Sequence, residues 1–315
     1  MSERRVLITG AAGYIGSLLG TRLVAEGVQV VGTDLRARTD LPFEVFALDI
    51  RSPRLKPLVR ELGATHVVHL AAVLESSGDR VTEYDIAVNG TKNVVEAALG
   101  ARVRHLTVSS SGAAYGYHAD NPPWITESHP LRATPAFAYA HHKRLVEEML
   151  ATYRVTRPSL GQLVFRIGTV LGAQTNNQIT ALFEKERVLA VRGSDSPFVF
   201  VWDEDVVGAM LHGVLENRTG VYNLAGDGAL TIHEIAARMG KGTRKLPAWV
   251  LWAALWAGRR LGVSRYGPEQ LDFLRYRPVL ANHRLKEELG YVPEKSSVEA
   301  FETWAAGRGP LARTS

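Results

Sequence analysis

The 315-residue sequence contains no cysteine, which excludes a disulfide framework and any metal site built from thiolates. Its ten histidines are scattered and no His-Glu-x-x-His pattern occurs, so we expect no metal site. Internal repeats, low-complexity tracts and flexible linkers are also missing. Because the first apolar segment begins at residue 6, no room remains for a signal peptide, and we expect a cytoplasmic protein.

Charge of one sign is not in large excess either, since 37 lysines and arginines stand against 32 acidic residues. The cations are scattered, so nucleic acid is not an expected partner. One apolar stretch, residues 246–257, is too short to cross a bilayer. Cations flank it on both sides: Lys241, Arg244 and Lys245 before it, Arg259 and Arg260 after it. We expect a buried helix there; a lid over an apolar substrate and a helix resting on an anionic membrane surface are the alternatives.

Three glycines, Gly10, Gly13 and Gly16, lie between a strand-like apolar run and a helical pattern. Such a turn aims backbone N–H groups and the positive end of a helix at a pyrophosphate. A second apolar run leads to Asp34, about 20 residues after the glycines, where a carboxylate can accept hydrogen bonds from ribose hydroxyls. The sequence therefore predicts a dinucleotide-binding site.

The acid at the end of the second run also selects between cofactors. The carboxylate of Asp34 would repel the 2′-phosphate of NADP, so NAD is the expected cofactor and NADP is disfavoured. Arg36 and Arg38 follow closely and are able to hold such a phosphate, although we expect both in a solvated loop.

Apolar runs alternate with helical patterns along the first half of the chain, which is typical of a parallel sheet with helices on both faces. Predicted strands lie at 45–48, 66–70, 105–108 and 163–165, and predicted helices at 15–26, 53–62, 85–99 and 137–153. We expect an α/β fold in which residues 1–170 form a Rossmann-type doubly wound parallel sheet. Residues 171–315 are expected to form a smaller mixed α/β substrate-binding lobe that shares this sheet.

Candidate catalytic residues lie in the middle of the chain. Tyr139 and Lys143 are four residues apart in a helical pattern, so their side chains share one face. A phenol ionises near pH 10, and a nearby ammonium should lower that pKa. The run Ser109-Ser110-Ser111 follows a predicted strand, where a hydroxyl can hydrogen-bond the reacting oxygen of a substrate. Taken alone, the tyrosine and lysine are also consistent with an exposed helix pair without a catalytic role.

Together these motifs resemble the extended short-chain dehydrogenase/reductases, the NAD-dependent epimerase/dehydratase family, over essentially the whole chain. The resemblance is carried by residues 9–16 (TGAAGYIG), Asp34, residues 48–50 (LDI), residues 69–72 (HLAA), the three serines with Tyr115-Gly116, and Tyr139 with Lys143. It implies that Ser111 is the catalytic hydroxyl, Tyr139 the acid/base and Lys143 its activator.

The resemblance also implies cofactor and partner contacts. Besides Tyr139 and Lys143, the cofactor-binding residues would be Gly10, Gly13, Tyr14, Ile15, Gly16, Asp34, Leu35, Arg36, Asp49, Ile50, Leu70, Ala71 and Ala72. A homodimer would pack through two helices, with apolar faces drawn from Val94, Val95, Ala97, Ala98, Leu145, Val146, Met149 and Leu150.

Several positions depart from the family pattern. Ala87 stands where members commonly have asparagine, and Asn89, two residues later, should face elsewhere on the helix. His142 replaces a small residue, and we expect a neutral surface histidine rather than a second titratable group near the site. On the substrate side, Thr169 replaces an asparagine of the sugar-nucleotide members. Arg192 and Arg277 are the remaining candidates for holding a diphosphate.

The resemblance implies hydride transfer between NAD and a secondary alcohol or ketone carbon, on a carbohydrate, a nucleotide sugar or a hydrophobic alcohol or ketone. A nucleotide-sugar 4-epimerase with tightly bound NAD is the first alternative, and a catalytically silent NAD-binding sensor or assembly protein is the second. Gly112-Ala113 follow Ser111 where family dehydratases often have Asp-Glu, so 4,6-dehydration is not expected.

Overall fold

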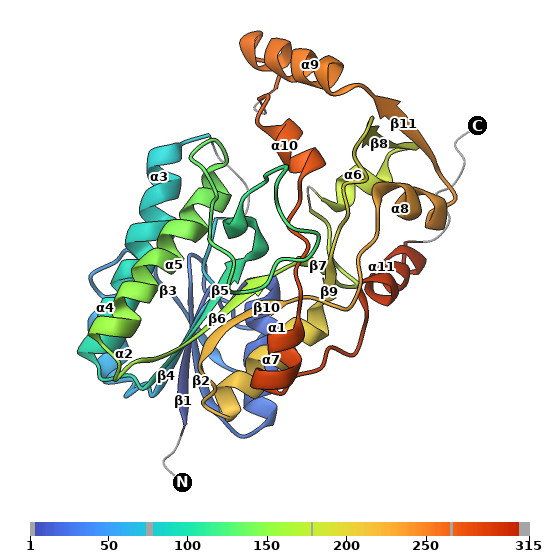
Figure 1. The fold of residues 1–315 in the computed structure, drawn as a ribbon. Helices are drawn as coiled ribbons and strands as arrows, with labels where there is room; N and C mark the ends of the chain where they lie inside the picture. Colours follow the sequence, from blue (N-terminus) through green and yellow to red (C-terminus); the bar gives the residue numbers. More distant parts are fainter. Residues whose placement is uncertain (1–3, 74–77, 178, 265–266, 309–315) are drawn as a thin grey trace.

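A computed structural model describes residues 4–73, 78–177, 179–264 and 267–308. A sheet of seven parallel strands lies at its centre, in the order β10-β6-β5-β4-β1-β2-β3 (Figure 1). The strands are β1 (Arg5–Thr9), β2 (Gln29–Asp34), β3 (Glu44–Ala47), β4 (His66–His69), β5 (His105–Ser111), β6 (Gly161–Ile167) and β10 (Gly220–Leu224). Strand order reverses between β1 and β4, and in such sheets ligands bind beyond the carboxyl ends of the strands at this point. The expected α/β, Rossmann-type doubly wound sheet is confirmed.

Helices cover both faces of the sheet. One face carries α1 (Tyr14–Ala25) and α7 (Asp203–Leu215). The other face carries α2 (Leu55–Glu61), α4 (Thr91–Gly100) and α5 (Ala138–Thr156). The helix expected at 85–99 begins as a π-helix, η1 (Asp85–Gly90), which continues α3 (Arg80–Tyr84). A short 3-10 turn, η2 (Gly112–Tyr115), follows β5.

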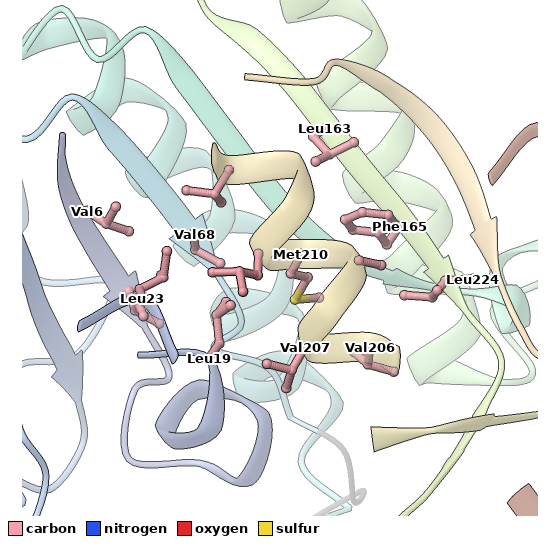
Figure 2. Close-up of a cluster of buried hydrophobic side chains, with 14 of the residues drawn as sticks. Val6, Leu19, Leu23, Val68, Leu163, Phe165, Val206, Val207, Met210 and Leu224 are labelled. Carbon is pink, nitrogen blue, oxygen red and sulfur yellow. The ribbon is translucent and has the colours of Figure 1, made fainter. Parts of the chain in front are cut away.

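The larger core lies between α1, α7 and the sheet. Figure 2 shows Val206, Val207 and Met210 of α7 among the side chains of this cluster, with Leu163 and Phe165 of β6 beside them. All five side chains are buried. Because α7 and β10 come from beyond residue 171, the second half of the chain completes the first half's sheet.

The remaining elements form the C-terminal lobe. Its strands are β7 (Thr169–Leu171), β8 (Arg187–Val191), β9 (Phe200–Trp202) and β11 (Gly242–Leu246), paired as β7 with β9 and β8 with β11. Its helices are α6 (Thr180–Glu184), α8 (Ile232–Arg238), α9 (Ala248–Arg260), α10 (Gln270–Arg275) and α11 (Ser297–Ala306). The π-helix η3 (Leu285–Leu289) instead packs into the larger core beside α7 and the main sheet. A buried aromatic cluster that includes Phe183, Phe198, Phe200, Phe301 and Trp304 forms its core. The division into residues 1–170 and 171–315 stays a prediction.

The expectation that the apolar stretch 246–257 forms a buried helix is wrong. Helix α9 buries only Leu251 among its residues, and Trp249, Trp252 and Trp256 are 73%, 48% and 52% exposed. The physical reason is that α9 packs mainly on the short helix α10, which can cover one side of it alone. In Figure 1 it stands at the margin of the molecule, between β11 and α10. No helix in the described part of the chain has both the length and the apolar character needed to cross a membrane.

Most of the apolar residues expected at a dimer interface serve the chain's own core. Six of the eight are buried within this chain: Val94, Val95, Ala97, Ala98, Val146 and Leu150. Leu145 and Met149 are partly buried. The faces of α4 and α5 therefore offer a partner less apolar surface than the sequence pattern indicates.

Candidate active site

The glycine turn joins β1 to α1 at the carboxyl edge of the sheet. Gly10 has a φ of +75° and donates its N–H to the carbonyl oxygen of Thr33 over 2.8 Å. A Cβ on Gly10 would lie 2.6 Å from the backbone nitrogen of Ala71, and one on Gly16 would overlap the carbonyl oxygen of Gly10. Gly13 is the extended residue before α1. The turn thus brings bare backbone and the first N–H groups of a 12-residue helix to one place, which suits a pyrophosphate.

Asp34 ends the neighbouring strand β2. Its Oδ2 accepts the N–H of Ala12 over 3.0 Å and its Oδ1 accepts the N–H of Leu35 over 2.7 Å. Each carboxylate oxygen retains a further lone pair for a ribose hydroxyl. Leu35 and Arg36 are exposed, while Arg38 pairs with Asp40. A carboxylate and a bare-backbone cradle are both present, so these residues fit NAD.

The next loop holds Asp49 and Ile50. Asp49 pairs with Arg51 at 2.6 Å, and this hydrogen-bonded guanidinium lowers the pKa of the Asp49 carboxyl. The side chain of Ile50 is buried, and a Cβ on Gly90 would lie 2.6 Å from its Cδ1. Asn93 donates to the carbonyl oxygen of Ile50 over 2.6 Å and fixes the loop. Because the side chain of Ile50 is buried, an adenine would contact the backbone of Ile50, and this contact stays a prediction.

The side chains of Tyr14 and Ile15 both contact other parts of the chain, although Tyr14 is 37% exposed. The hydroxyl of Tyr14 donates to the carboxylate of Asp203 at the start of α7, and burial together with this carboxylate raises the pKa of Tyr14 to about 12. Ile15 is partly buried against the core under α1. At these two positions the backbone N–H groups, rather than the side chains, are available for a phosphate.

Ser111, Tyr139 and Lys143 meet where β5 ends beside the first turns of α5. The Ser111 hydroxyl accepts the N–H of Ala113 over 3.1 Å and is hydrogen-bonded to the Tyr139 side chain. The Nζ of Lys143 donates to the carbonyl oxygen of Ser109 over 2.7 Å and lies 5.8 Å from the centre of the Tyr139 ring. The expected juxtaposition of hydroxyl, phenol and ammonium is thus present in the structure.

A single cavity joins Tyr139 and Lys143 to the loop that follows β4. Ala71 and Ala72 line it together with Tyr139, Lys143 and Ser109. Leu70 anchors that loop, because its N–H donates to the carbonyl oxygen of Thr9 over 3.0 Å. The same cavity therefore reaches both the cofactor residues and the catalytic residues implied by the sequence.

The expected lowering of the tyrosine pKa does not occur in this structure. Burial raises the pKa of Tyr139, and the hydrogen bond from Ser111 opposes the shift only in part. Burial also lowers the pKa of Lys143 to about 8, with the charge of Glu147 opposing it. The physical reason is that desolvation of both groups outweighs their attraction. Tyr139 therefore carries its proton at neutral pH, as a proton donor should.

The structure places Ala87, Asn89 and His142, the helix positions at which this sequence departs from the family pattern. Ala87 lines the cavity, while Asn89 is exposed and donates to Asp85 over 2.9 Å, as the helix geometry predicts. The expectation of a surface location for His142 is wrong, because its side chain is buried and lines the cavity. The ring of Tyr84, from the adjoining helix α3, packs edge-on against it at 5.7 Å. Burial lowers the pKa of His142, so it is neutral at pH 7, as expected.

An aromatic cluster, which sequence reasoning missed, lies next to Tyr139. Tyr117, Phe137 and Phe273 have ring centres 4.8–5.7 Å apart, and Tyr139 lies close enough to Tyr117 to contribute to raising the pKa of Tyr117. Phe137 is two residues before Tyr139, a spacing that the sequence shows. Phe273 comes from α10, and no local pattern could have placed it there.

Arg277 adjoins this aromatic cluster. Its guanidinium lies between Phe198 and Phe273, 3.7 and 4.4 Å from their ring centres, and it donates to Ser196. Burial lowers the pKa of Arg277 to about 9, with Tyr117 opposing the shift. No carboxylate in the described part of the chain forms an ion pair with Arg277.

The other two expected substrate residues lie in the lobe's small sheets. Thr169 opens β7 and pairs with Phe200 of β9, its N–H donating to the carbonyl oxygen of Val199 over 3.1 Å. Arg192 follows β8 with an exposed side chain, and its N–H donates to the carbonyl oxygen of Leu246. Of the two candidate arginines, only Arg277 is thus linked by contacts to the aromatic cluster beside Tyr139.

Comparison with known proteins adds a family match. The model of the NAD dependent epimerase/dehydratase family matches residues 6–225. An uncharacterized protein of Mycobacterium tuberculosis is 25% identical over 96% of this chain and 84% of its own length. A UDP-glucose 4-epimerase of Mycolicibacterium smegmatis is 37% identical, but the match covers 48% of this chain and 51% of that protein.

Solved structures agree with this match over nearly the full chain. The UDP-glucose 4-epimerase of Thermus thermophilus, in complex with NAD, is 25% identical and superimposes with a TM-score of 0.75, covering 98% of this chain and all of that one. The Bordetella bronchiseptica enzyme WbmG, in complex with NAD and UDP, is 19% identical with a TM-score of 0.76, covering 97% and 94%. The second likeness shows the fold alone.

Proposed function

This chain belongs to the NAD-dependent epimerase/dehydratase family, and on that premise we propose that it transfers hydride between NAD and the carbon of a secondary alcohol or ketone. The observation that carries the proposal is the meeting of Ser111, Tyr139 and Lys143 at the end of β5, where Tyr139 and Lys143 line one cavity together with Ala71 and Ala72. A hydroxyl, a phenol and an ammonium in that arrangement provide an acid/base and a hydrogen-bond donor for a reacting oxygen.

NAD is the cofactor that the residues support. The glycine turn and the first N–H groups of α1 would hold its pyrophosphate, and the Asp34 carboxylate would hold the adenosine ribose. When bound, NAD supplies the chemistry of accepting or returning a hydride at its nicotinamide ring.

The chain's own residues handle the proton. Tyr139 would give its hydroxyl proton to the substrate oxygen during ketone reduction and take it back during alcohol oxidation. Ser111, hydrogen-bonded to Tyr139, would donate to the same oxygen and orient it. Lys143, held by the carbonyl oxygen of Ser109, would stabilise the phenolate left by proton transfer and contact the nicotinamide ribose.

The surroundings of Tyr139 favour an apolar substrate. Tyr117, Phe137 and Phe273 gather next to Tyr139, and alanines and valines line much of the cavity. An apolar lining with a few polar groups is typical of pockets for small organic molecules. A hydrophobic alcohol or ketone is the first substrate class to test.

A nucleotide-sugar 4-epimerase is the second candidate, because Arg277 is half-buried between aromatic rings without a carboxylate partner in the described part of the chain. A desolvated cation gains from being paired, and a diphosphate would pair it. The similarity to UDP-glucose 4-epimerases supports the same candidate. A silent NAD-binding sensor is the third, and it predicts bound NAD without turnover.

The homodimer also remains a proposal. The resemblance implies packing through α4 and α5, where Leu145 and Met149 are partly buried in the single chain. Sedimentation at micromolar concentration tests it, and a monomer alone would contradict it.

Replacement of the phenol tests the catalytic proposal. Tyr139→Phe should lower turnover at least about 100-fold while NAD still binds, because general acid/base catalysis contributes roughly that much. Tyr153→Phe is the matched control, since Tyr153 lies on the same helix with its hydroxyl at the outer side, 3.5 Å from Glu96. Equal turnover in the wild type and Tyr139→Phe on an identified substrate would contradict the assigned role.

Native mass spectrometry of the freshly purified protein separates the two reactions. Tightly retained NAD or NADH supports the epimerase, in which the cofactor is regenerated in place, and UDP-sugars are then tested first. Reversible binding of added NAD supports net oxidation or reduction, with hydrophobic alcohols and ketones tested first.

A further inference from the structure

The exposed tryptophans of α9 share one face of the helix. Trp249, Trp252 and Trp256 follow the spacing i, i+3, i+7, and the rings of the last two stack with centres 6.5 Å apart. Leu251 projects from the opposite side into a small cluster with Val191. Large apolar side chains gathered on an exposed face are typical of an interaction surface.

Two further apolar side chains are exposed just after the helix, since Leu261 and Val263 are 74% and 79% exposed. We define the tryptophan face as Trp249, Trp252 and Trp256. Tryptophan is the side chain that prefers the boundary between water and lipid, where its ring contacts acyl chains and its N–H stays among polar groups.

The charges around the tryptophan face have one sign. No aspartate or glutamate occurs in the 34 residues from 235 to 268, whereas seven lysines and arginines do. Four of these cations are exposed beside the two ends of α9: Arg244, Lys245, Arg259 and Arg260. Arg259 pairs with Glu269 at 3.3 Å. Cations at both ends of a short tryptophan-bearing helix match the negative charge of an anionic lipid surface.

The length of α9 determines how the helix can contact a lipid surface. Thirteen residues extend about 20 Å, less than the roughly 30 Å hydrocarbon core of a bilayer. The helix must therefore lie in the plane of the surface rather than cross it. A second copy of this chain is the poorer occupant, because a symmetric contact would bring two sets of the same cations together.

We propose that α9 docks the protein on anionic membranes, with the tryptophan face inserted at the lipid boundary and Arg244, Lys245 and Arg260 on the lipid headgroups. Helix α10 packs on α9 and carries Phe273 to the aromatic cluster, so α10 links α9 to the residues next to Tyr139. The proposal does not depend on the proposed reaction, because docking is measured without turnover.

Flotation of the full chain with vesicles tests the proposal. The wild type should float with phosphatidylcholine vesicles that contain about a third phosphatidylglycerol and should stay at the bottom with phosphatidylcholine alone. Two double variants, Trp252→Gln/Trp256→Gln and Lys245→Glu/Arg260→Glu, should each partition at least about tenfold less. Trp124→Gln is the matched control, since Trp124 is 46% exposed in another part of the chain, and should float like the wild type. Unchanged thermal midpoints check that all variants fold.

Three results would overturn the docking proposal. The wild type could remain at the bottom with anionic vesicles, or the two double variants could float as well as the wild type. The third is a wild-type dimer that dissociates in Trp252→Gln/Trp256→Gln without any flotation, which would assign the tryptophan face to a second copy.

Discussion

The ion pair between Glu147 and Arg166 gives the sharpest stability prediction. Glu147 lies on α5, one turn after Lys143, and Arg166 lies on β6; their side chains are 5% and 8% exposed. The guanidinium donates to Oε2 of Glu147 from Nε over 2.9 Å and from Nη2 over 2.8 Å, and to Oε1 from Nε over 3.2 Å. Ser110 of β5 also donates to Glu147, and Arg166 donates to the Tyr115 hydroxyl over 2.7 Å. This pair therefore fixes the catalytic helix to the sheet.

Glu147→Gln removes the negative charge while keeping the side chain's size. Arg166 is then left as a buried cation without its counter-charge, which costs about 3 kcal/mol or more of unfolding free energy. With a denaturant slope of about 3 kcal/mol/M for a chain of this size, the urea midpoint should fall by roughly 1 M. The charge of Glu147 also raises the pKa of Lys143, so its loss should lower that pKa further.

The neighbouring residue provides the control. Glu148 pairs with Arg144 at 3.4 Å but is 54% exposed, so Glu148→Gln should change stability by less than about 0.5 kcal/mol. In Glu147→Leu/Arg166→Met the loss should be smaller than the sum of the two single losses, because neither charge is left behind. If Glu147→Gln unfolds at the same urea concentration as Glu148→Gln, the reasoning about the buried charge is refuted.

Three further predictions concern pH and the glycine turn. Burial lowers the pKa of His69 to about 3 and that of His66 to about 4, whereas an unfolded histidine titrates near 6.5. The unfolded chain therefore binds more protons than the folded chain below pH 6.5, so the unfolding free energy should fall as the pH drops from about 6.5 to 4. Urea titrations at several pH values measure this fall, and it should be shallower in His66→Gln. Because burial lowers the pKa of Lys143 to about 8, kcat/KM for ketone reduction should decline above pH 8 as Lys143 loses its charge. If the same decline with pH occurs in Lys143→Arg, Lys143 is not the group that causes it. Gly16→Ala should destabilise the fold by about 2 kcal/mol, because the added methyl group overlaps the carbonyl oxygen of Gly10. Calorimetry should also show that this variant no longer binds NAD. Gly242→Ala is the control and should show neither effect, because no heavy atom lies nearer than 3.9 Å to the added methyl group.

The cofactor half of the site could be predicted from the sequence because its determinants are local. The glycine turn, the acid at the end of β2 and the four-residue spacing of Tyr139 and Lys143 all lie within short windows. Their backbone geometry follows from strand and helix periods alone. The ends of the expected strands at 45–48, 66–70, 105–108 and 163–165 lie within about three residues of the ends of β3 to β6.

The substrate half could not be predicted because its contacts join distant segments. Phe273 meets Phe137 across more than a hundred residues, and Arg277 meets Phe198 across nearly eighty. His142 was expected at the surface because its burial depends on Tyr84, from a different helix. The spacing of the tryptophans in α9 was visible in the sequence. Because residues on every side of this helix are apolar, the sequence did not show which side would pack against the rest of the chain.

The return of the chain to its first sheet has a consequence for synthesis on the ribosome. β6 pairs with β5 on one side and with β10 on the other, and α7 covers Leu163 and Phe165. Translation at about 5–20 residues per second therefore leaves β6 as an open sheet edge for several seconds after it is made. During that interval the nascent chain exposes the side chains of β6 that are later buried, and this is the stage at which a chaperone that holds exposed strands would act.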